Sequence, residues 1–275
     1  MIVDAQSHIW GANTPERPWP ARTNPHRPVP FSKDDLLNEM NAAGVDRVII
    51  VPPSWEGDRN DLALAAAQAH PDRFAVMGRL DTEAPHARDA LKTWRTQPGM
   101  LGLRFVFHSP VFIPLLLEGR MDWVWREAEA AGIPVMIYPL QNHLLLVDGI
   151  AQQHPGLQIV IDHLALPYLT KDEAAFANFD LLLPLARRPN IAVKASTLPS
   201  HTTDTYPYRS THLYLRRAFD AFGPKRLFWA TDFTAMPCTY RQGITMFTEE
   251  LPWLSAEDKE WIMGRAVCDW LGWKA

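Results

Sequence analysis

The amino-acid sequence predicts a (β/α)8 barrel, the fold known as the TIM barrel, and two observations lead to this prediction. The chain has 275 residues, which is close to the length of one such barrel with modest loops. Short runs rich in Val and Ile alternate along the chain with longer stretches of helical period. This alternation is typical of a parallel sheet with helices between its strands. We therefore expect a single α/β domain over residues 1–275.

Eight apolar runs are predicted to be the strands of the barrel. Their hydrophobic residues are continuous instead of alternating, as expected for parallel strands that are covered on both faces. An open, doubly wound sheet is the alternative, but no Gly-x-Gly-x-x-Gly phosphate turn follows the first strand. The predicted strands are residues 2–8, 47–51, 74–80, 101–107, 134–138, 158–163, 191–195 and 227–232.

Stretches of helical period fill the intervals between these runs. The proline-rich segment from Thr14 to Pro30 follows the first strand, so in a barrel it would lie at the catalytic face. We expect this segment to form a lid or a pocket wall, and the sequence leaves open whether it closes over the pocket. The predicted helices are residues 33–43, 61–69, 85–94, 121–131, 143–153, 171–187, 211–222 and 256–271.

The composition excludes several classes of protein. The net charge of −4 gives no cationic excess, which disfavours a nucleic-acid binder. We also expect no membrane partner, because no run reaches the roughly 18 uninterrupted apolar residues that a membrane span needs. Two cysteines are too few for a disulfide scaffold, and the start of the chain lacks the pattern of a signal peptide. We therefore expect a cytoplasmic protein that acts on a small molecule; the sequence leaves open whether it forms a homo-oligomer.

Polar side chains occur at the ends of most of the predicted strands. The active site of a barrel is built from the carboxyl ends of its strands, so these residues are the candidates for chemistry. Gln6 and His8 are two residues apart and therefore point to the same side of the first strand. The candidates are Gln6, His8, Arg104, Tyr138, His163, Lys194, Ser196 and Asp232.

Each candidate also has a structural explanation when it is taken alone. A histidine at a strand end is often a hydrogen-bonded rim residue, and Asp232 could cap the turn after the last strand. Arg104 and Lys194 could form a structural ion pair near the surface. Taken together, these residues are much harder to explain by stability, so we expect at least three of them to line an active site.

Aromatic residues near the same strand ends point to a ring-shaped or partly apolar substrate. Trp10 is the one that we include among the substrate-binding candidates, together with Tyr138. Tryptophans in loops serve equally well as packing residues, and that explanation stays open for each of them. The aromatic set comprises Trp10, Trp19, Trp55, Phe107 and Tyr138.

Five segments, in order along nearly the whole chain, resemble the amidohydrolase-related family. They are Val-Asp-Ala-Gln-Ser-His-Ile-Trp (3–10), Leu-Gly-Leu-Arg (101–104), Val-Ile-Asp-His-Leu-Ala-Leu-Pro (160–167), Val-Lys-Ala-Ser (193–196) and Phe-Trp-Ala-Thr-Asp-Phe (228–233). The resemblance is closest to the branch of 2-pyrone-4,6-dicarboxylate lactonases and L-fuconolactonases. It implies a distorted TIM barrel, hydrolysis of a lactone, and Asp232 as the general base.

One departure from the family pattern concerns the metal. The family opens with His-x-His on the first strand, and this chain has Gln6 at the first of these positions. A neutral amide oxygen binds zinc weakly, and residues 133–138 offer no replacement ligand. His8, His163 and Asp232 remain, and three protein ligands with one water form a catalytic zinc site. We therefore expect either no cofactor or one divalent ion, zinc or manganese.

Three functions are consistent with these residues. In the leading one, Asp232 takes a proton from water that attacks a small lactone or cyclic ester, which carries carboxylates in one version of the hypothesis. His8, His163, Arg104 or Lys194 would stabilise the oxyanion or bind those carboxylates. The second function is zinc-dependent decarboxylation of an aromatic acid, and Gln6 counts against it. The third is an inactive barrel that only binds a ligand.

Overall fold

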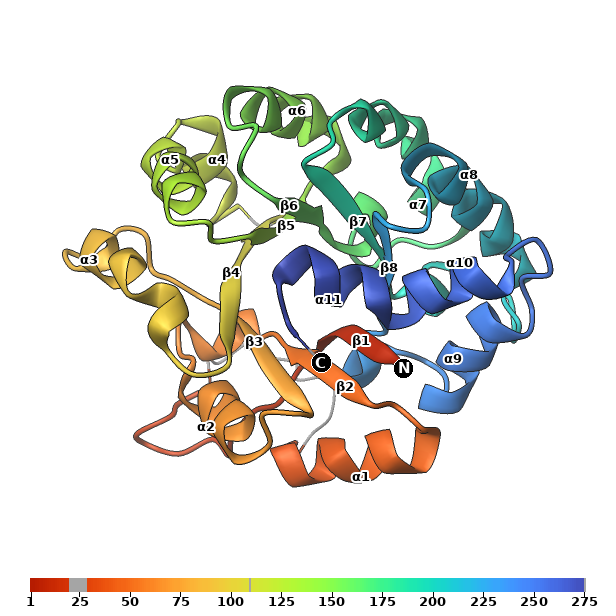
Figure 1. The fold of residues 1–275 in the computed structure, drawn as a ribbon, viewed down its shortest axis with the longest axis horizontal. Helices are drawn as coiled ribbons and strands as arrows, with labels where there is room; N and C mark the ends of the chain where they lie inside the picture. The colour runs from red at the N-terminus through yellow and green to blue at the C-terminus, as the bar shows by residue number, and fades with distance from the viewer. Residues whose placement is uncertain (20–28, 109, 275) are drawn as a thin grey trace.

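The computed structural model describes residues 1–19, 29–108 and 110–274, and its centre is one sheet of eight parallel strands. The strands follow each other around the sheet in the order of the sequence, with helices on the outside (Figure 1). This arrangement confirms the predicted (β/α)8 barrel. The strands are β1 (Val3–Ser7), β2 (Arg47–Ile50), β3 (Phe74–Gly78), β4 (Met100–Phe107), β5 (Val135–Pro139), β6 (Ile159–Ile161), β7 (Ile191–Ala195) and β8 (Leu227–Trp229).

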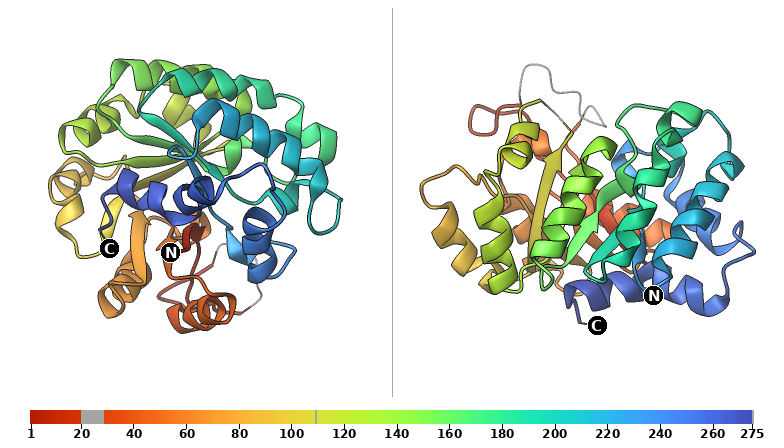
Figure 2. Two further views of the ribbon diagram at one scale, coloured as in Figure 1. Left: turned by 45° about the vertical axis from the view of Figure 1, so that its right-hand side comes forward. Right: turned by 90° about the horizontal axis from the view of Figure 1, so that it is seen from above.

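The helices connect these strands and cover the outer face of the sheet (Figure 2). They are α1 (Lys33–Ala43), α2 (Asp61–Ala69), α3 (Ala87–Lys92), α4 (Ile113–Leu117), α5 (Asp122–Ala130), α6 (Leu144–Gln153), α7 (Asp172–Phe176), α8 (His212–Phe222), α9 (Tyr240–Thr248), α10 (Ala256–Glu260) and α11 (Ala266–Leu271). Within the described residues, no helix is both long enough and apolar enough to span a membrane.

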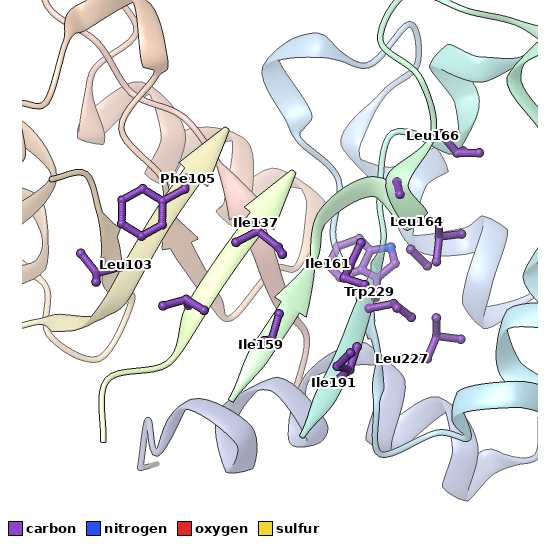
Figure 3. Packing of buried hydrophobic residues seen from close by; sticks show 14 of the residues in the cluster. Leu103, Phe105, Ile137, Ile159, Ile161, Leu164, Leu166, Ile191, Leu227 and Trp229 are labelled. Atoms are coloured by element: carbon purple, nitrogen blue, oxygen red, sulfur yellow. The ribbon is translucent and has the colours of Figure 1, made fainter. Parts of the chain in front are cut away.

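Successive residues of a strand belong to two different apolar layers. Leu103, Ile137 and Ile161 point outward and pack with the helices in one large buried cluster (Figure 3). Their neighbours Met136 and Val160 point inward and belong to a second cluster inside the barrel. Complete burial of such a side chain contributes about 1.5–3 kcal/mol, so both layers stabilise the barrel. Both faces are apolar, which is why the strands appear in the sequence as continuous hydrophobic runs.

The C-terminal helices close the end of the barrel at which the strands begin. Helix α11 crosses this end beside both chain termini (Figure 1), and Val267 and Leu271 join the inner cluster. Gly264 lies so close to β1 that an added Cβ would meet Val3 Cγ2 at 2.8 Å and Met1 O at 3.0 Å. This close approach lets the C-terminal helices pack across the base of the barrel, at the end opposite to the carboxyl ends of the strands.

Several predicted elements differ from the structure at their ends. The predicted strands 158–163 and 227–232 end earlier, at Ile161 and Trp229, and left-handed residues follow them at His163 and Asp232. The predicted helix 171–187 is α7 followed by two short 3-10 turns, and Pro184 lies in the second turn. The predicted helix 256–271 is interrupted between α10 and α11, where Gly264 is not helical. Helices α4 and α9 were not predicted.

The junction between β8 and β1 is joined by a buried carboxylate. Asp4 is fully buried and accepts hydrogen bonds from Thr231 N at 2.8 Å, from Tyr240 Oη at 2.7 Å, and from the Thr231 hydroxyl. One main-chain bond, from Asp232 N to Gln6 O at 2.9 Å, continues the junction toward the open end of the barrel. Burial raises the pKa of Asp4 to about 6, although these hydrogen bonds oppose the shift. Asp4 therefore satisfies one main-chain donor and two side-chain hydroxyls at the junction between β8 and β1.

Replacing Asp4 with Ala should lower the free energy of unfolding by about 3 kcal/mol, because it leaves several buried donors without an acceptor. Tyr240→Phe is the control, since it removes one donor while Thr231 keeps its acceptor, and it should lower the same quantity by only about 1 kcal/mol. Urea-induced unfolding followed by circular dichroism measures both. An Asp4→Ala variant as stable as the parent would show that the carboxylate does not hold the junction.

Candidate active site

A cavity of about 640 Å³ lies at the end of the barrel where the strands finish. Its walls include side chains from β1, β4 and β5 and from the segments that follow β6 and β8. Of the candidate residues, those that line this cavity are Gln6, His8, Arg104, Tyr138, His163 and Asp232. The fold thus brings together residues that lie as far apart as position 6 and position 232 of the chain.

Irregular backbone geometry occurs beside four of these side chains, two at the end of β1 and two after β6 and β8. The register of β1 against β2 shifts between Asp4 and Ser7. Val3 and Ala5 belong to the inner apolar cluster, whereas Gln6 and His8 line the cavity. His163 and Asp232 have φ values of +54° and +55°. A left-handed conformation costs a non-glycine residue about 1–3 kcal/mol, and such strain is concentrated at functional sites.

His8 and Asp232 form a close pair at the cavity wall. His8 Nε2 lies 2.9 Å from Asp232 Oδ1, and His8 Nδ1 lies 2.5 Å from the carbonyl oxygen of Val51. A carbonyl oxygen can only accept, so Nδ1 carries a proton and donates it to Val51. Nε2 is therefore the ring nitrogen that faces Asp232, and this close pair borders the cavity.

His163 has defined partners on both ring nitrogens. Its Nδ1 lies 2.7 Å from Ser196 Oγ, and its Nε2 lies 3.3 Å from the amide nitrogen of Gln6 and 4.0 Å from Asp232 Oδ2. Burial lowers the pKa of His163 to about 3, although the carboxylates of Asp232 and Asp162 oppose the shift. The imidazole is therefore neutral at ordinary pH, with Nε2 accepting a hydrogen bond from Gln6.

Beneath these residues lies a buried ion cluster centred on Asp162. Lys194 Nζ is 2.7 Å from one carboxylate oxygen of Asp162, and Arg104 Nε is 3.1 Å from the other. Burial alone would raise the pKa of Asp162, but the charges of Lys194 and Arg104 outweigh it and hold this pKa below its ordinary value. Arg104 also lines the cavity. Two cations facing one carboxylate give this part of the site a positive charge.

Other candidates lie behind the wall of the cavity. Lys194 is fully buried and does not line the cavity, so its place differs from the direct substrate contact that we expected. Ser196 likewise lies behind the wall, against His163. Trp10 is only 2% exposed, packs against Phe31 and Trp55, and donates its indole N–H to Val29 O at 3.0 Å. It supports the wall and does not face the cavity.

Of the remaining aromatic residues, Trp55 and Tyr138 line the cavity. The ring of Tyr138 meets that of His163 with centroids 4.8 Å apart, and its hydroxyl donates to Leu166 O at 2.6 Å. Trp19 packs on Trp55, and Phe107 belongs to the outer cluster beside the helices. Residues 20–28 of the segment from Thr14 to Pro30 lie outside the described residues, so its role as a lid stays a prediction.

Several cavity residues were missed by the sequence analysis. His108 lies two residues beyond Val106 and four beyond Arg104, and all three line the cavity. Burial and the charge of Arg104 lower the pKa of His108 to about 4. The alternation along β4 was sufficient to predict this residue. Tyr168 and Lys171 also line the cavity, but they come from the loop after β6, where no periodic signal marks them.

The donor set expected for a metal does not fit a metal ion in this arrangement. His8, His163 and Asp232 are adjacent, but the amide N–H of Gln6 points at the nitrogen of His163 that would bind the ion. The oxygen of the same amide is turned away, 2.5 Å from Lys194 Nζ. Among the described residues, no group of three or more His, Cys, Asp or Glu side chains is arranged to hold a metal ion.

Comparison with known proteins gives this site a family context. The family model described as amidohydrolase matches residues 3–266. An L-fucono-1,5-lactonase of Burkholderia ambifaria is 26% identical over 242 residues, covering 84% of this chain and 79% of that protein. A 4-sulfomuconolactone hydrolase of Hydrogenophaga intermedia is 23% identical over 236 residues, covering 84% and 73%.

The same fold occurs in a solved amidohydrolase from Burkholderia multivorans with bound zinc. The two structures superimpose with a TM-score of 0.83 over 99% of each chain, at 21% sequence identity. The family model covers almost the whole barrel, including the strand ends that build the cavity. The resemblance inferred from the five segments is confirmed, and the chain belongs to the amidohydrolase family of hydrolases.

Proposed function

We propose that this protein hydrolyses a small lactone that carries an acidic group, with Asp232 as the general base. The two curated relatives described above are both named as enzymes that act on lactones. One of these names also specifies a sulfo group, which is anionic. The observation that carries the proposal is the placement of the His8–Asp232 pair and of Arg104 on one cavity wall.

The reaction needs a base that removes a proton from water. Asp232 borders the cavity, and its contact with His8 leaves the second carboxylate oxygen on the side of His163, 4.0 Å away. In the proposed step this carboxylate takes a proton from water, and the hydroxide attacks the lactone carbonyl. The tetrahedral intermediate then breaks the ring C–O bond, and Asp232 returns the proton to the leaving alkoxide. The product is an open-chain hydroxy acid.

The charge of the cavity favours an anionic substrate. Arg104 and Lys171 both line it, and among the described residues of the lining Asp232 is the acidic one. Arg104 is held by Asp162 through Nε, a geometry that leaves its two terminal nitrogens to form a fork. A guanidinium fork binds a carboxylate or sulfonate through paired hydrogen bonds, and the partly buried position strengthens this contact. We therefore assign Arg104 to the acidic group of the substrate.

The structure leaves fewer of the residues that we considered from the sequence as stabilisers of the oxyanion. His163 and Lys194 use their N–H donors on Ser196, Gln6 and Asp162. Arg104 is assigned to the acidic group of the substrate, so His8, which keeps its place on the cavity wall, is the candidate for this role. Zinc-dependent decarboxylation, the second function considered, requires a firm metal site, which this donor arrangement does not support.

Asp232→Asn should lower kcat for lactone hydrolysis by about 10³-fold, because an amide cannot accept the proton from water. Asp220→Asn is the control, since Asp220 is an exposed residue of α8 that pairs with Arg216 away from the cavity. Ring opening can be followed by the release of acid against a pH indicator. If Asp232→Asn keeps more than about a tenth of the parent kcat, the general-base assignment is wrong.

Arg104→Lys should raise KM for a lactone with a carboxylate or sulfonate about tenfold, because lysine keeps a charge near Asp162 but loses the guanidinium fork. KM for a neutral lactone of the same ring size should change little. Steady-state kinetics on the matched pair of lactones gives the comparison. An equal effect on both substrates would contradict the assignment of Arg104 and leave that of Asp232 untouched.

A parent protein that hydrolyses no member of such a lactone panel, but binds one of them, would contradict the proposed hydrolysis. That outcome would favour the third function considered from the sequence, a barrel that only binds its ligand. Isothermal titration calorimetry with the same lactones separates binding from turnover.

A further inference from the structure

Lys194 is a buried cation whose environment fixes it in one place. Its ammonium group is 2.7 Å from Asp162 Oδ1, 2.5 Å from Gln6 Oε1 and 3.3 Å from Met136 Sδ. The ammonium group thus faces a carboxylate oxygen, an amide oxygen and a sulfur atom. Lys194 has no exposed surface, so water does not compete for these contacts. The cation is therefore held rigidly below the cavity.

The fixed cation determines which way the Gln6 amide points. Lysine only donates hydrogen bonds, so the atom of Gln6 that faces it must be the carbonyl oxygen. The amide nitrogen then faces His163 Nε2 at 3.3 Å, and this ring nitrogen must accept. The other ring nitrogen, Nδ1, is consequently protonated and donates to Ser196 Oγ at 2.7 Å. A flipped amide would place N–H hydrogens against the ammonium group, an arrangement without an acceptor.

This chain of hydrogen bonds affects the site where a metal ion would bind. A zinc ion needs the unprotonated Nε2 of His163 as a ligand, and that lone pair is engaged by Gln6. Lys194 also interacts electrostatically with Asp232, so it supplies positive charge to the same carboxylate that would bind the ion.

We propose that Lys194 and Gln6 replace a divalent metal ion in this site: the ammonium group supplies the positive charge, and the amide that it orients occupies His163 Nε2. Lys194 and Gln6 are then positioning residues, which act on the site through His163 and Asp232. The relative with bound zinc shows that a metal ion is compatible with the fold, so the exclusion arises from these side chains. The inference does not depend on which substrate the enzyme hydrolyses.

The test compares zinc binding by the full-length parent and by two variants, each treated with a chelator, incubated with zinc sulfate and desalted. The parent should retain less than about 0.1 zinc per chain, because His163 Nε2 is occupied. The double variant Gln6→His, Lys194→Met adds an imidazole and removes the cation, so it should retain about one zinc per chain. Elemental analysis gives the metal content, and circular dichroism shows whether each protein is folded.

Gln141→His is the matched control, because it also places a histidine at a buried glutamine, but outside the cavity lining. It should retain as little zinc as the parent. The proposal is overturned if the parent keeps one zinc per chain, or if the folded double variant stays free of zinc.

A second measurement applies even if the double variant does not fold. Nitrogen-15 NMR of the parent should show His163 as the neutral tautomer with the proton on Nδ1. A His163→Asn variant assigns the resonances. A proton on Nε2 would contradict the proposed orientation of the Gln6 amide and overturn the inference.

Discussion

The architecture of the site depends on one buried carboxylate, Asp162. It lies at the end of β6 with no exposed surface and faces two cations, Lys194 from β7 and Arg104 from β4. Removing one partner from a buried ion pair commonly costs 3–5 kcal/mol, because an uncompensated charge remains. Without Asp162, both cations would be buried against each other inside the barrel. The carboxylate of Asp162 therefore allows polar side chains to replace apolar ones inside the barrel, directly beneath the cavity.

The two cations, which Asp162 holds in place, position groups in different parts of the cavity. Lys194 fixes Gln6, and Gln6 in turn fixes the ring of His163 beside Asp232. Arg104 is held through Nε and reaches the cavity wall. One carboxylate thus sets the orientation of the groups beside the proposed base and of the group proposed to bind the substrate. Such buried polar networks contribute more to a single defined geometry than to net stability.

Much of this arrangement could be predicted from the sequence because apolar runs identify parallel strands and strand ends identify the catalytic face of a barrel. This reasoning selected Gln6, His8, His163 and Asp232, which the structure places around one cavity. It could not give the depth of a side chain, so Lys194 was expected at the substrate although it lies beneath Gln6. The local pattern likewise could not reveal the register shift in β1 or the left-handed residues that end β6 and β8. These features arise from contacts between segments that are distant in the chain.

In the proposed lactone hydrolysis, side chains of this protein take the place of a metal ion. The most direct measurement is the rate of hydrolysis of an acidic lactone by chelator-treated protein, before and after zinc is added back. We expect the metal-free protein to have its full rate, and we expect added zinc to give no increase. A protein that is inactive without zinc and regains activity with it would contradict the account.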